Sequence, residues 1–227
     1  MTKYHNIIFL LLIIIIFIIF FVIFRILNYL KTKNKLFLTT KLYPQFKILE
    51  DNWEKIRDEI PFFDINKISI ERSKDTWIGE KMDKFAEKFK DKVEWFKAWT
   101  DSESWYNYPI IYNNNFVANV EEICPNTCNL LKLFNNIRIA GFSLLTPNGD
   151  IQIHNDATGP NYNSMAFNML LYGKKSSLYV KLENQTKFYK YNHKDGKAVI
   201  FNSEQYHFAD NKDNSHRIIL YIDFFTN

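Results

Sequence analysis

Residues 151–156 read Ile-Gln-Ile-His154-Asn-Asp156 and lie within the stretch on which the fold depends, residues 143–217. In a β-strand, side chains two residues apart point to the same face, so His154 and Asp156 are expected to project together. A folded sheet that brought the distant His207 alongside would complete a set of two histidines and one carboxylate. Such a set leaves half of an octahedron open and is diagnostic of non-haem Fe(II) oxygenases. Because an isolated His-x-Asp is common by chance, other residues must support this hypothesis.

Arg217 provides that support. It stands in the stretch Ser-His-Arg217-Ile-Ile-Leu-Tyr-Ile-Asp223, whose poor alternation is typical of a buried strand. A buried arginine needs an anion, and its planar guanidinium suits a carboxylate, which it can bind through two parallel hydrogen bonds. The distal carboxylate of 2-oxoglutarate would meet this need while the keto-acid end chelates iron.

Further stretches match a known family. In chain order they are Phe142-Ser143-Leu-Leu-Thr-Pro147-Asn-Gly149, His154, Gly159-Pro160-Asn161, Tyr206-His207-Phe208 and Arg217-Ile-Ile-Leu-Tyr-Ile-Asp223. With them the chain resembles the aspartyl/asparaginyl β-hydroxylases, which are iron- and 2-oxoglutarate-dependent dioxygenases. The resemblance extends upstream through Cys124-Pro-Asn-Thr-Cys128-Asn-Leu-Leu and Leu49-Glu-Asp-Asn-Trp53-Glu-Lys-Ile-Arg57-Asp-Glu, and covers residues 45–227. It implies a double-stranded β-helix with iron at its open end.

Two positions depart from the family's pattern. The animal peptide hydroxylases have a glycine where Asp156 stands, whereas bacterial lipid A hydroxylases of the same family carry His-x-Asp. The family also has a histidine that contacts the cosubstrate and an arginine two residues earlier, and the aligned positions here hold Asn168 and Ala166. Asn168 can still donate a hydrogen bond, but the arginine of the usual substrate recognition is missing.

Ser143 matches a serine of the family that contacts the cosubstrate. A hydroxyl beside Arg217 would share the same carboxylate, although a serine satisfied within the core is equally compatible with the sequence. The resemblance therefore implies Fe(II) at His154, Asp156 and His207. It also implies 2-oxoglutarate at Arg217, Ser143 and Asn168, with O2 as the other cosubstrate.

The length of 227 residues allows one domain and an anchor. We expect a transmembrane anchor over residues 1–25, a basic juxtamembrane linker over 26–44 and a dioxygenase domain over 45–227. The net charge of +4 is mild and spread along the chain, so a nucleic-acid partner is not expected.

Residues 7–24 are 18 consecutive apolar residues without a charge. At about 1.5 Å per residue this helix spans roughly 27 Å, close to the hydrocarbon thickness of a bilayer. The run is longer than that of a signal peptide and has no small-residue cleavage site, which predicts an uncleaved single-pass anchor. Lys3 precedes it, whereas five basic residues follow: Arg25, Lys31, Lys33, Lys35 and Lys41. These charges favour a cytosolic domain, the animal members of the family favour the endoplasmic reticulum lumen, and the side stays open.

Apolar periodicity predicts helices over residues 44–60 and 74–96, and Pro125 and Thr127 fit a helix start. Residues 100–117, rich in Asp, Ser, Asn and Tyr, are predicted to be a loop crossing the sheet, with Tyr106-Asn-Tyr-Pro109 at the rim of the site. Strands are predicted over residues 137–145, 166–172, 178–182, 187–191, 198–202 and 217–224. The fold class is therefore α+β, mainly β, a cupin-like double-sheet jelly roll with N-terminal helices.

The remaining histidines and the two cysteines carry less information. His193 lies in the polar turn Tyr-Asn-His193-Lys-Asp and is predicted to face solvent, and His216 is predicted to point away from Arg217. Cys124 and Cys128 are a poor zinc site without a second pair, which leaves free thiols or a disulfide.

Three functional hypotheses remain. The first is an iron- and 2-oxoglutarate-dependent dioxygenase that hydroxylates an Asp or Asn side chain of a protein. The second is the same chemistry on a lipid acyl chain, which the His-x-Asp motif and the short tether to the membrane favour. The third is a membrane-anchored binding module that keeps the fold without turnover.

Overall fold

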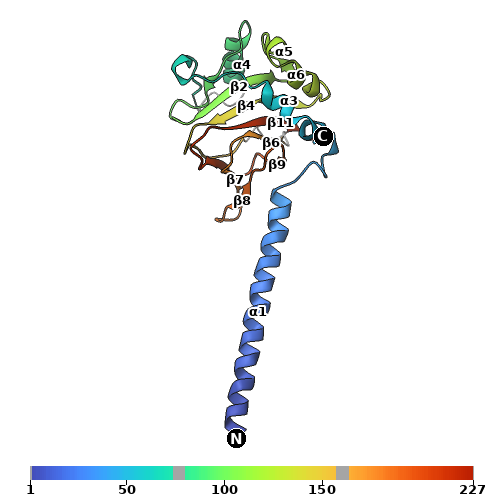
Figure 1. The fold of residues 1–227 in the computed structure, drawn as a ribbon, viewed down its shortest axis with the longest axis vertical. Helices are drawn as coiled ribbons and strands as arrows, with labels where there is room; N and C mark the ends of the chain where they lie inside the picture. Colours follow the sequence, from blue (N-terminus) through green and yellow to red (C-terminus); the bar gives the residue numbers. More distant parts are fainter. Residues whose placement is uncertain (1, 74–79, 157–163, 227) are drawn as a thin grey trace. The chain divides into compact units, whose positions relative to one another are not determined.

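The computed structural model describes residues 2–73, 80–156 and 164–226 (Figure 1). The chain forms two compact units, Met1–Leu36 and Phe37–Asn227. The predictions that fall on residues 74–79 and 157–163, including the Gly159-Pro160-Asn161 motif, lie outside the described residues.

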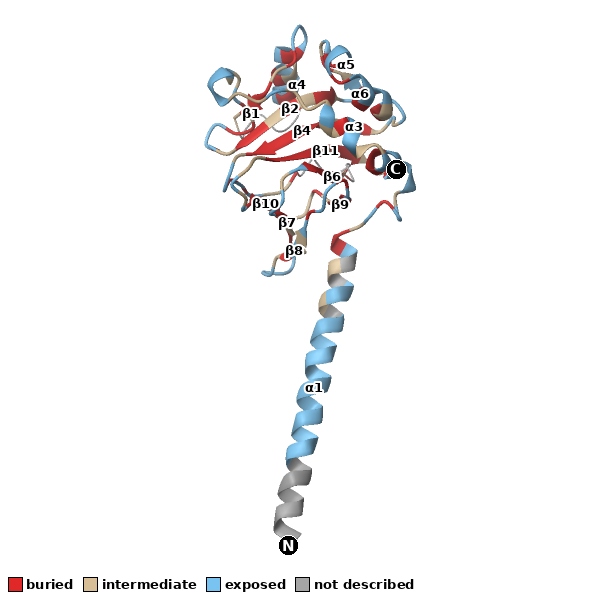
Figure 2. Ribbon diagram, in the orientation of Figure 1, coloured by how far each residue is buried: buried red, intermediate tan, exposed pale blue. Residues whose placement is uncertain are grey.

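The first unit is a single helix, α1 (Thr2–Leu36). Within it, Leu11–Lys31 is long and apolar enough to cross a membrane, by length and composition. The apolar side chains from Leu11 to Leu27 are exposed: Phe17, for example, is 73% exposed (Figure 2). The helix runs through the first part of the predicted linker, and the rest of that linker belongs to the second unit.

Short helices begin the second unit. The predicted helix over 44–60 is present as three pieces, interrupted at Asn52: η1 (Pro44–Phe46), α2 (Lys47–Asp51) and α3 (Trp53–Asp58). A further turn, η2 (Ile65–Lys67), follows. The buried side chains of Phe46, Leu49 and Ile56 recur at helical spacing and enter the main core.

The predicted helix over 74–96 is wrong beyond Phe89. The described part is helical only in α4 (Glu80–Ala86) and η4 (Glu87–Phe89). After it, Val93 and Trp95 are buried in irregular backbone that leads into a strand. The alternation of apolar residues there reflects burial against the sheet rather than one face of a helix. Two more helices, α5 (Val120–Ile123) and α6 (Pro125–Leu131), have the start predicted at Pro125.

Eleven antiparallel strands form two sheets in the described residues. The larger sheet has the order β1-β2-β4-β11-β6-β9, with β3 on β2, and the smaller has the order β5-β10-β7-β8. The larger sheet consists of β1 (Phe96–Lys97), β2 (Trp105–Tyr112), β3 (Asn115–Phe116), β4 (Ile137–Leu145), β6 (Ser164–Tyr172), β9 (Ala198–Asn202) and β11 (Arg217–Phe225). The smaller consists of β5 (Asp150–His154), β7 (Ser176–Val180), β8 (Tyr189–Asn192) and β10 (His207–Asn211).

The larger sheet has an apolar face and a polar face. Its apolar face carries Phe142, Phe167 and Leu220, which form the main core with the helices (Figure 1). The ring of Phe46 lies 5.2 Å from that of Phe167. Figure 2 shows β4 and β11 buried in the middle of the domain. The opposite face looks toward the smaller sheet, which confirms the predicted mainly β, cupin-like architecture.

The prediction of a loop over residues 100–117 is wrong, because this segment contains β2 and β3. Its Trp and Tyr side chains are buried by neighbouring strands, which composition alone does not show. The strand irregularity between Pro109 and Ile111 is matched by Gly141 on β4. A Cβ at Gly141 would lie 2.4 Å from the carbonyl oxygen of Tyr108, so the close approach of β2 and β4 requires glycine there.

Glu59 joins the end of α3 to the start of α6. Its carboxylate accepts hydrogen bonds from the backbone N–H groups of Asn126 and Thr127, each at 2.7 Å, and from the Thr127 hydroxyl at 2.7 Å. A carboxylate at a helix N-terminus satisfies otherwise unpaired N–H groups and complements the helix dipole.

Replacing Glu59 by alanine should therefore destabilise the domain. The substitution leaves the fully buried Thr127 without its acceptor, and we expect a loss of about 2 kcal/mol in the free energy of unfolding. Thermal and denaturant unfolding of the full chain in detergent would measure it. Glu54→Ala, an exposed position on the same helix, is the matched control, and equal stability of the two variants would contradict the assignment.

Candidate functional site: a His-Asp-His cluster beside a buried arginine

The three side chains of the predicted metal set lie together. His154 ends β5, His207 begins β10, and the two residues face each other across the antiparallel pair. One potential ligand atom from each of His154, Asp156 and His207 lies within 4.8 Å of the others. The Nε2 atoms of His154 and His207 lie 3.8 and 3.7 Å from the Asp156 carboxylate oxygens. This cluster has the size and donor set for one metal ion.

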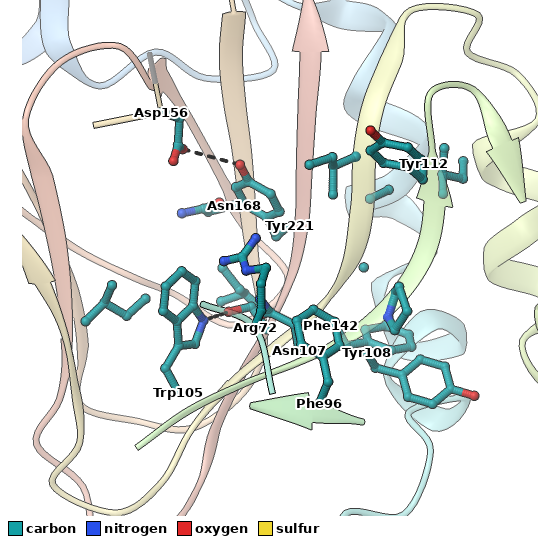
Figure 3. A pocket seen from close by; sticks show the side chains of 18 of the residues that line it. Arg72, Phe96, Trp105, Asn107, Tyr108, Tyr112, Phe142, Asp156, Asn168 and Tyr221 are labelled. Atoms are coloured by element: carbon teal, nitrogen blue, oxygen red, sulfur yellow. Dashed lines mark hydrogen bonds between the residues drawn. The ribbon is translucent and has the colours of Figure 1, made fainter. Parts of the chain in front are cut away.

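The route by which Asp156 reaches the cluster differs from the prediction. Strand β5 stops at His154, so the two residues do not share a strand face. Instead, the backbone N–H of Asp156 donates to the carbonyl of Ser203 at 2.9 Å, which draws the chain toward the start of β10. The Tyr221 hydroxyl also points at the Asp156 carboxylate, at 3.5 Å (Figure 3).

Backbone carbonyls orient both histidines. Nδ1 of His154 lies 2.7 Å from the carbonyl oxygen of Gln152, and Nδ1 of His207 lies 2.8 Å from that of Gln205. Because a carbonyl only accepts, each Nδ1 carries a proton, and each Nε2 is turned toward the cluster. Burial and the neighbouring His154 lower the pKa of His207 to about 4, against the opposing charge of Asp156. Two neutral imidazoles and a carboxylate are the ligand state that a divalent cation requires.

Arg217 lines the same cavity from the start of β11 and is completely buried. Its Nε donates to the hydroxyl of Ser176 at 3.0 Å, whereas its Nη1 and Nη2 have no hydrogen-bond partner among the described residues. Burial lowers the pKa of Arg217 to about 9, with Asp210 opposing, so the side chain stays charged at neutral pH. Two orphaned donors on a buried cation fit a carboxylate ligand.

Ser143 and Asn168 line the cavity near these groups. The Ser143 hydroxyl accepts a hydrogen bond from Trp105 Nε1 at 2.9 Å, which leaves its own proton available for a ligand. Asn168 is buried, and its Oδ1 has no partner in the described part of the chain. The structure thus brings all six predicted site residues to one cavity.

Beyond these polar groups the cavity is apolar. The apolar part is formed by α4, η4, β1 and β2, and its lining includes Met82, Phe85, Phe89, Phe96, Ile111 and Val117. Asn107, Tyr108 and Pro109 of β2 also contribute, in line with the prediction that this segment borders the site. The cavity therefore combines polar groups, which fit a metal and a carboxylate, with apolar side chains, which fit a substrate with apolar parts.

Arg72 is a cavity residue that sequence reasoning missed. It is 2% exposed, and its Nε donates to the carbonyl of Ala98 at 2.9 Å. Figure 3 shows its side chain in the same cavity as Asn168 and Tyr221. Burial lowers the pKa of Arg72 to about 10, and the Asp156 carboxylate opposes that shift. No motif surrounds Arg72, so only the folded chain reveals that a second guanidinium reaches the site.

The prediction that His193 faces solvent is wrong, because this side chain is buried and its Nδ1 lies 2.9 Å from the Ser176 hydroxyl. His216, predicted to point away from Arg217, lies against the ring of Phe63 and does not line the cavity. Cys124 and Cys128 are buried free thiols. Burial raises the pKa of each to about 12, so neither is a reactive nucleophile.

Comparison with known proteins places this chain in a family. The sequence model of the family described as aspartyl/asparaginyl beta-hydroxylase matches residues 50–227. Uncharacterized protein L888 of Acanthamoeba polyphaga mimivirus is 30% identical over 161 residues, which are 68% of this chain and 55% of that protein. The chain therefore spans about half the length of this curated relative.

Two solved structures are similar to this chain at lower sequence identity. An oxidoreductase of the 2OG-Fe(II) oxygenase family from Burkholderia pseudomallei shares 14% identity at a TM-score of 0.41, over 60% of this chain and 73% of that one. A Pseudomonas putida prolyl-4-hydroxylase shares 12% identity at a TM-score of 0.38, over 56% and 76%. Neither likeness supports an inference about chemistry. The family match covers most of the chain, and the chain therefore belongs to the aspartyl/asparaginyl β-hydroxylases, a family of 2-oxoglutarate-dependent dioxygenases.

Proposed function

We propose that this chain is a membrane-anchored Fe(II)- and 2-oxoglutarate-dependent dioxygenase that hydroxylates Asp or Asn side chains of proteins. One observation carries the proposal. The His154–Asp156–His207 cluster and the two orphaned guanidinium nitrogens of Arg217 line a single cavity. 2-Oxoglutarate is a keto diacid, so it needs a metal site for its keto-acid end and a cation for its far carboxylate, and the cavity offers residues for both.

In this proposal His154 and His207 bind Fe(II) through Nε2, and Asp156 binds it through its carboxylate. Such a face leaves coordination positions open for other ligands. Bound Fe(II) supplies the activation of O2 that couples oxidative decarboxylation of 2-oxoglutarate to hydroxylation of the substrate. The protein's residues keep the ligand atoms oriented and exclude water. The carbonyls of Gln152 and Gln205 perform the first task, because they fix both imidazole rings.

Arg217 binds the far carboxylate of 2-oxoglutarate through Nη1 and Nη2. Ser143 donates its hydroxyl proton to the same ligand, because Trp105 already occupies the acceptor side of that oxygen. Asn168 offers a side-chain amide from β6. Charges support this arrangement. A divalent metal beside one carboxylate leaves a single positive charge, Arg217 adds another, and the dianion of 2-oxoglutarate balances both.

Two features of the chain support an Asp side chain as the substrate group. The family match covers residues 50–227, and the buried cation Arg72 lines the cavity. Arg72 places a positively charged hydrogen-bond donor on the cavity wall, which suits an acidic substrate group. The lipid acyl chain remains the second candidate, because the other end of the cavity is apolar and Leu11–Lys31 is apolar enough to cross a membrane.

We propose that α1 anchors the chain in a membrane by a single span. Basic residues after the span favour a cytosolic domain, whereas the animal members of the family favour the endoplasmic reticulum lumen. A glycosylation acceptor inserted after Asn227 would distinguish the two sides, since only a lumenal domain would be modified.

The first test of the function is comparative mass spectrometry. Cells that express the parent chain should contain proteins with one added oxygen on an Asp or Asn side chain. Cells that express His207→Ala should lack that oxygen. An added oxygen on a lipid acyl chain instead would establish the second candidate. Binding of Fe(II) and 2-oxoglutarate without any oxidised product would leave a binding module without turnover.

A second test concerns the metal. The full chain in detergent should bind one Fe(II) or Mn(II), and His207→Ala should lose most of it because two ligands hold a metal less tightly than three. His216→Ala, a histidine outside the cavity, is the control and should retain the metal. Elemental analysis after gel filtration measures the content. Undiminished metal in both His154→Ala and His207→Ala would refute the assignment.

A third test concerns Arg217. Removing one partner of a buried charge-assisted pair costs about 2–5 kcal/mol, which corresponds to about 30- to several-thousand-fold in affinity. Arg217→Ala should therefore weaken 2-oxoglutarate by that factor while metal binding stays nearly intact. Arg217→Lys should recover only part of the affinity, because a point charge cannot reproduce the planar fork.

Calorimetric titration of the Mn(II)-loaded protein measures this affinity without a prime substrate. Lys212→Ala removes an exposed positive charge and serves as the control. If Arg217→Ala binds 2-oxoglutarate like the parent, the carboxylate receptor lies elsewhere.

A further inference from the structure

A chain of hydrogen bonds lies behind Arg217, on the side away from the cavity's ligand space. Nε of Arg217 donates to the Ser176 hydroxyl at 3.0 Å, and that hydroxyl lies 2.9 Å from Nδ1 of His193. All three side chains are buried. The backbone supports the arrangement, because the N–H of His193 donates to the carbonyl of Ser176 at 3.0 Å.

The direction of the first bond follows from the donors available. A guanidinium only donates, so Ser176 accepts from Arg217. The Ser176 hydroxyl still has its proton and a second lone pair, so it can either donate to Nδ1 of His193 or accept a hydrogen bond from it. Burial, together with the positive charge of Arg217, holds the pKa of His193 well below its ordinary value of 6.5. The imidazole is therefore neutral at neutral pH, and a neutral ring can form this bond in either direction.

We propose that His193, acting through Ser176, is a positioning residue that sets the orientation of Arg217 for the far carboxylate of 2-oxoglutarate. The inference rests on the proposed function. Because Ser176 occupies Nε, the guanidinium can meet a carboxylate in parallel only through Nη1 and Nη2, which are the two nitrogens left without partners among the described residues. The orientation of the guanidinium plane of Arg217 is then set before the ligand binds.

We call the hydrogen-bonded set Arg217–Ser176–His193 the relay, and its chemistry matters as much as its geometry. An aspartate behind Nε would orient the guanidinium equally well, but it would also neutralise the charge that attracts the cosubstrate. A hydroxyl and a neutral imidazole hold the group without cancelling its charge.

Four variants and two ligands test the relay. Ser176→Ala removes the hydroxyl, and His193→Leu removes the ring nitrogen at similar volume. His193→Asn places an amide, which can accept or donate, near the former Nδ1 position and should preserve the bond. Ser177→Ala is the matched control, because Ser177 is the next residue on β7 and its hydroxyl bonds to Asn192 instead. The two ligands are 2-oxoglutarate and oxalate, which can chelate the metal but is too short to reach Arg217.

Calorimetric titrations of the full-length, Mn(II)-loaded protein in detergent would give the affinities. We expect Ser176→Ala to weaken 2-oxoglutarate about 10-fold or more and His193→Leu about 3- to 10-fold, since each removes a hydrogen bond that supports a charged group. His193→Asn and Ser177→Ala should stay within about twofold of the parent, below the effect of one such bond. Oxalate affinity should not change in any variant.

Other outcomes would overturn the relay. Unchanged 2-oxoglutarate affinity in both Ser176→Ala and His193→Leu would show that Arg217 needs no support from behind. Equal weakening of 2-oxoglutarate and oxalate would show that these residues only hold the fold together. A parent chain that takes up Mn(II) and oxalate but no 2-oxoglutarate would refute the proposed cosubstrate, and the relay with it.

Discussion

The buried positive charge of Arg217 is the constraint on which the rest of the domain depends. Moving a guanidinium out of water costs several kcal/mol unless other groups compensate, and this side chain has no exposed surface. The backbone around it is equally crowded. Gly173 adopts φ +115°, and a Cβ there would lie 3.1 Å from the Cα of Arg217. The chain thus reserves space for the arginine at the point where β6 ends and β11 begins.

The His154–Asp156–His207 cluster depends on a different feature, the pairing of two strand ends. His154 and His207 are cross-strand partners, so the β5–β10 ladder itself sets the separation of the two rings, whose centroids lie 4.2 Å apart. The third member arrives by a backbone bond to Ser203 outside the ladder. One sheet therefore supplies the histidines and the other supplies Arg217, and the spacing between the sheets sets the distance between the histidine cluster and the guanidinium.

Sequence reasoning succeeded where a local pattern decides the structure. Apolar runs predicted β4, β6, β9 and β11 to within two residues, and motif spacing brought together the residues now found around one cavity. It failed where burial comes from distant partners. Strand β2 is rich in Tyr and Asn, and its strand character arises from β4 alongside it. His193 sits among polar neighbours typical of a turn, yet its side chain is buried and bonds to Ser176.

Strand β9 is the outer strand of the larger sheet, and its free edge is covered by the residues that follow α1. Leu38 forms two backbone hydrogen bonds with Ile200, at 2.8 and 2.9 Å, and the ring of Phe37 lies 5.5 Å from that of Tyr191. An open strand edge is a template for pairing with other chains. A truncation that removes α1 and begins at Pro44 would expose this edge and promote aggregation, whereas one that begins at Phe37 would keep it covered.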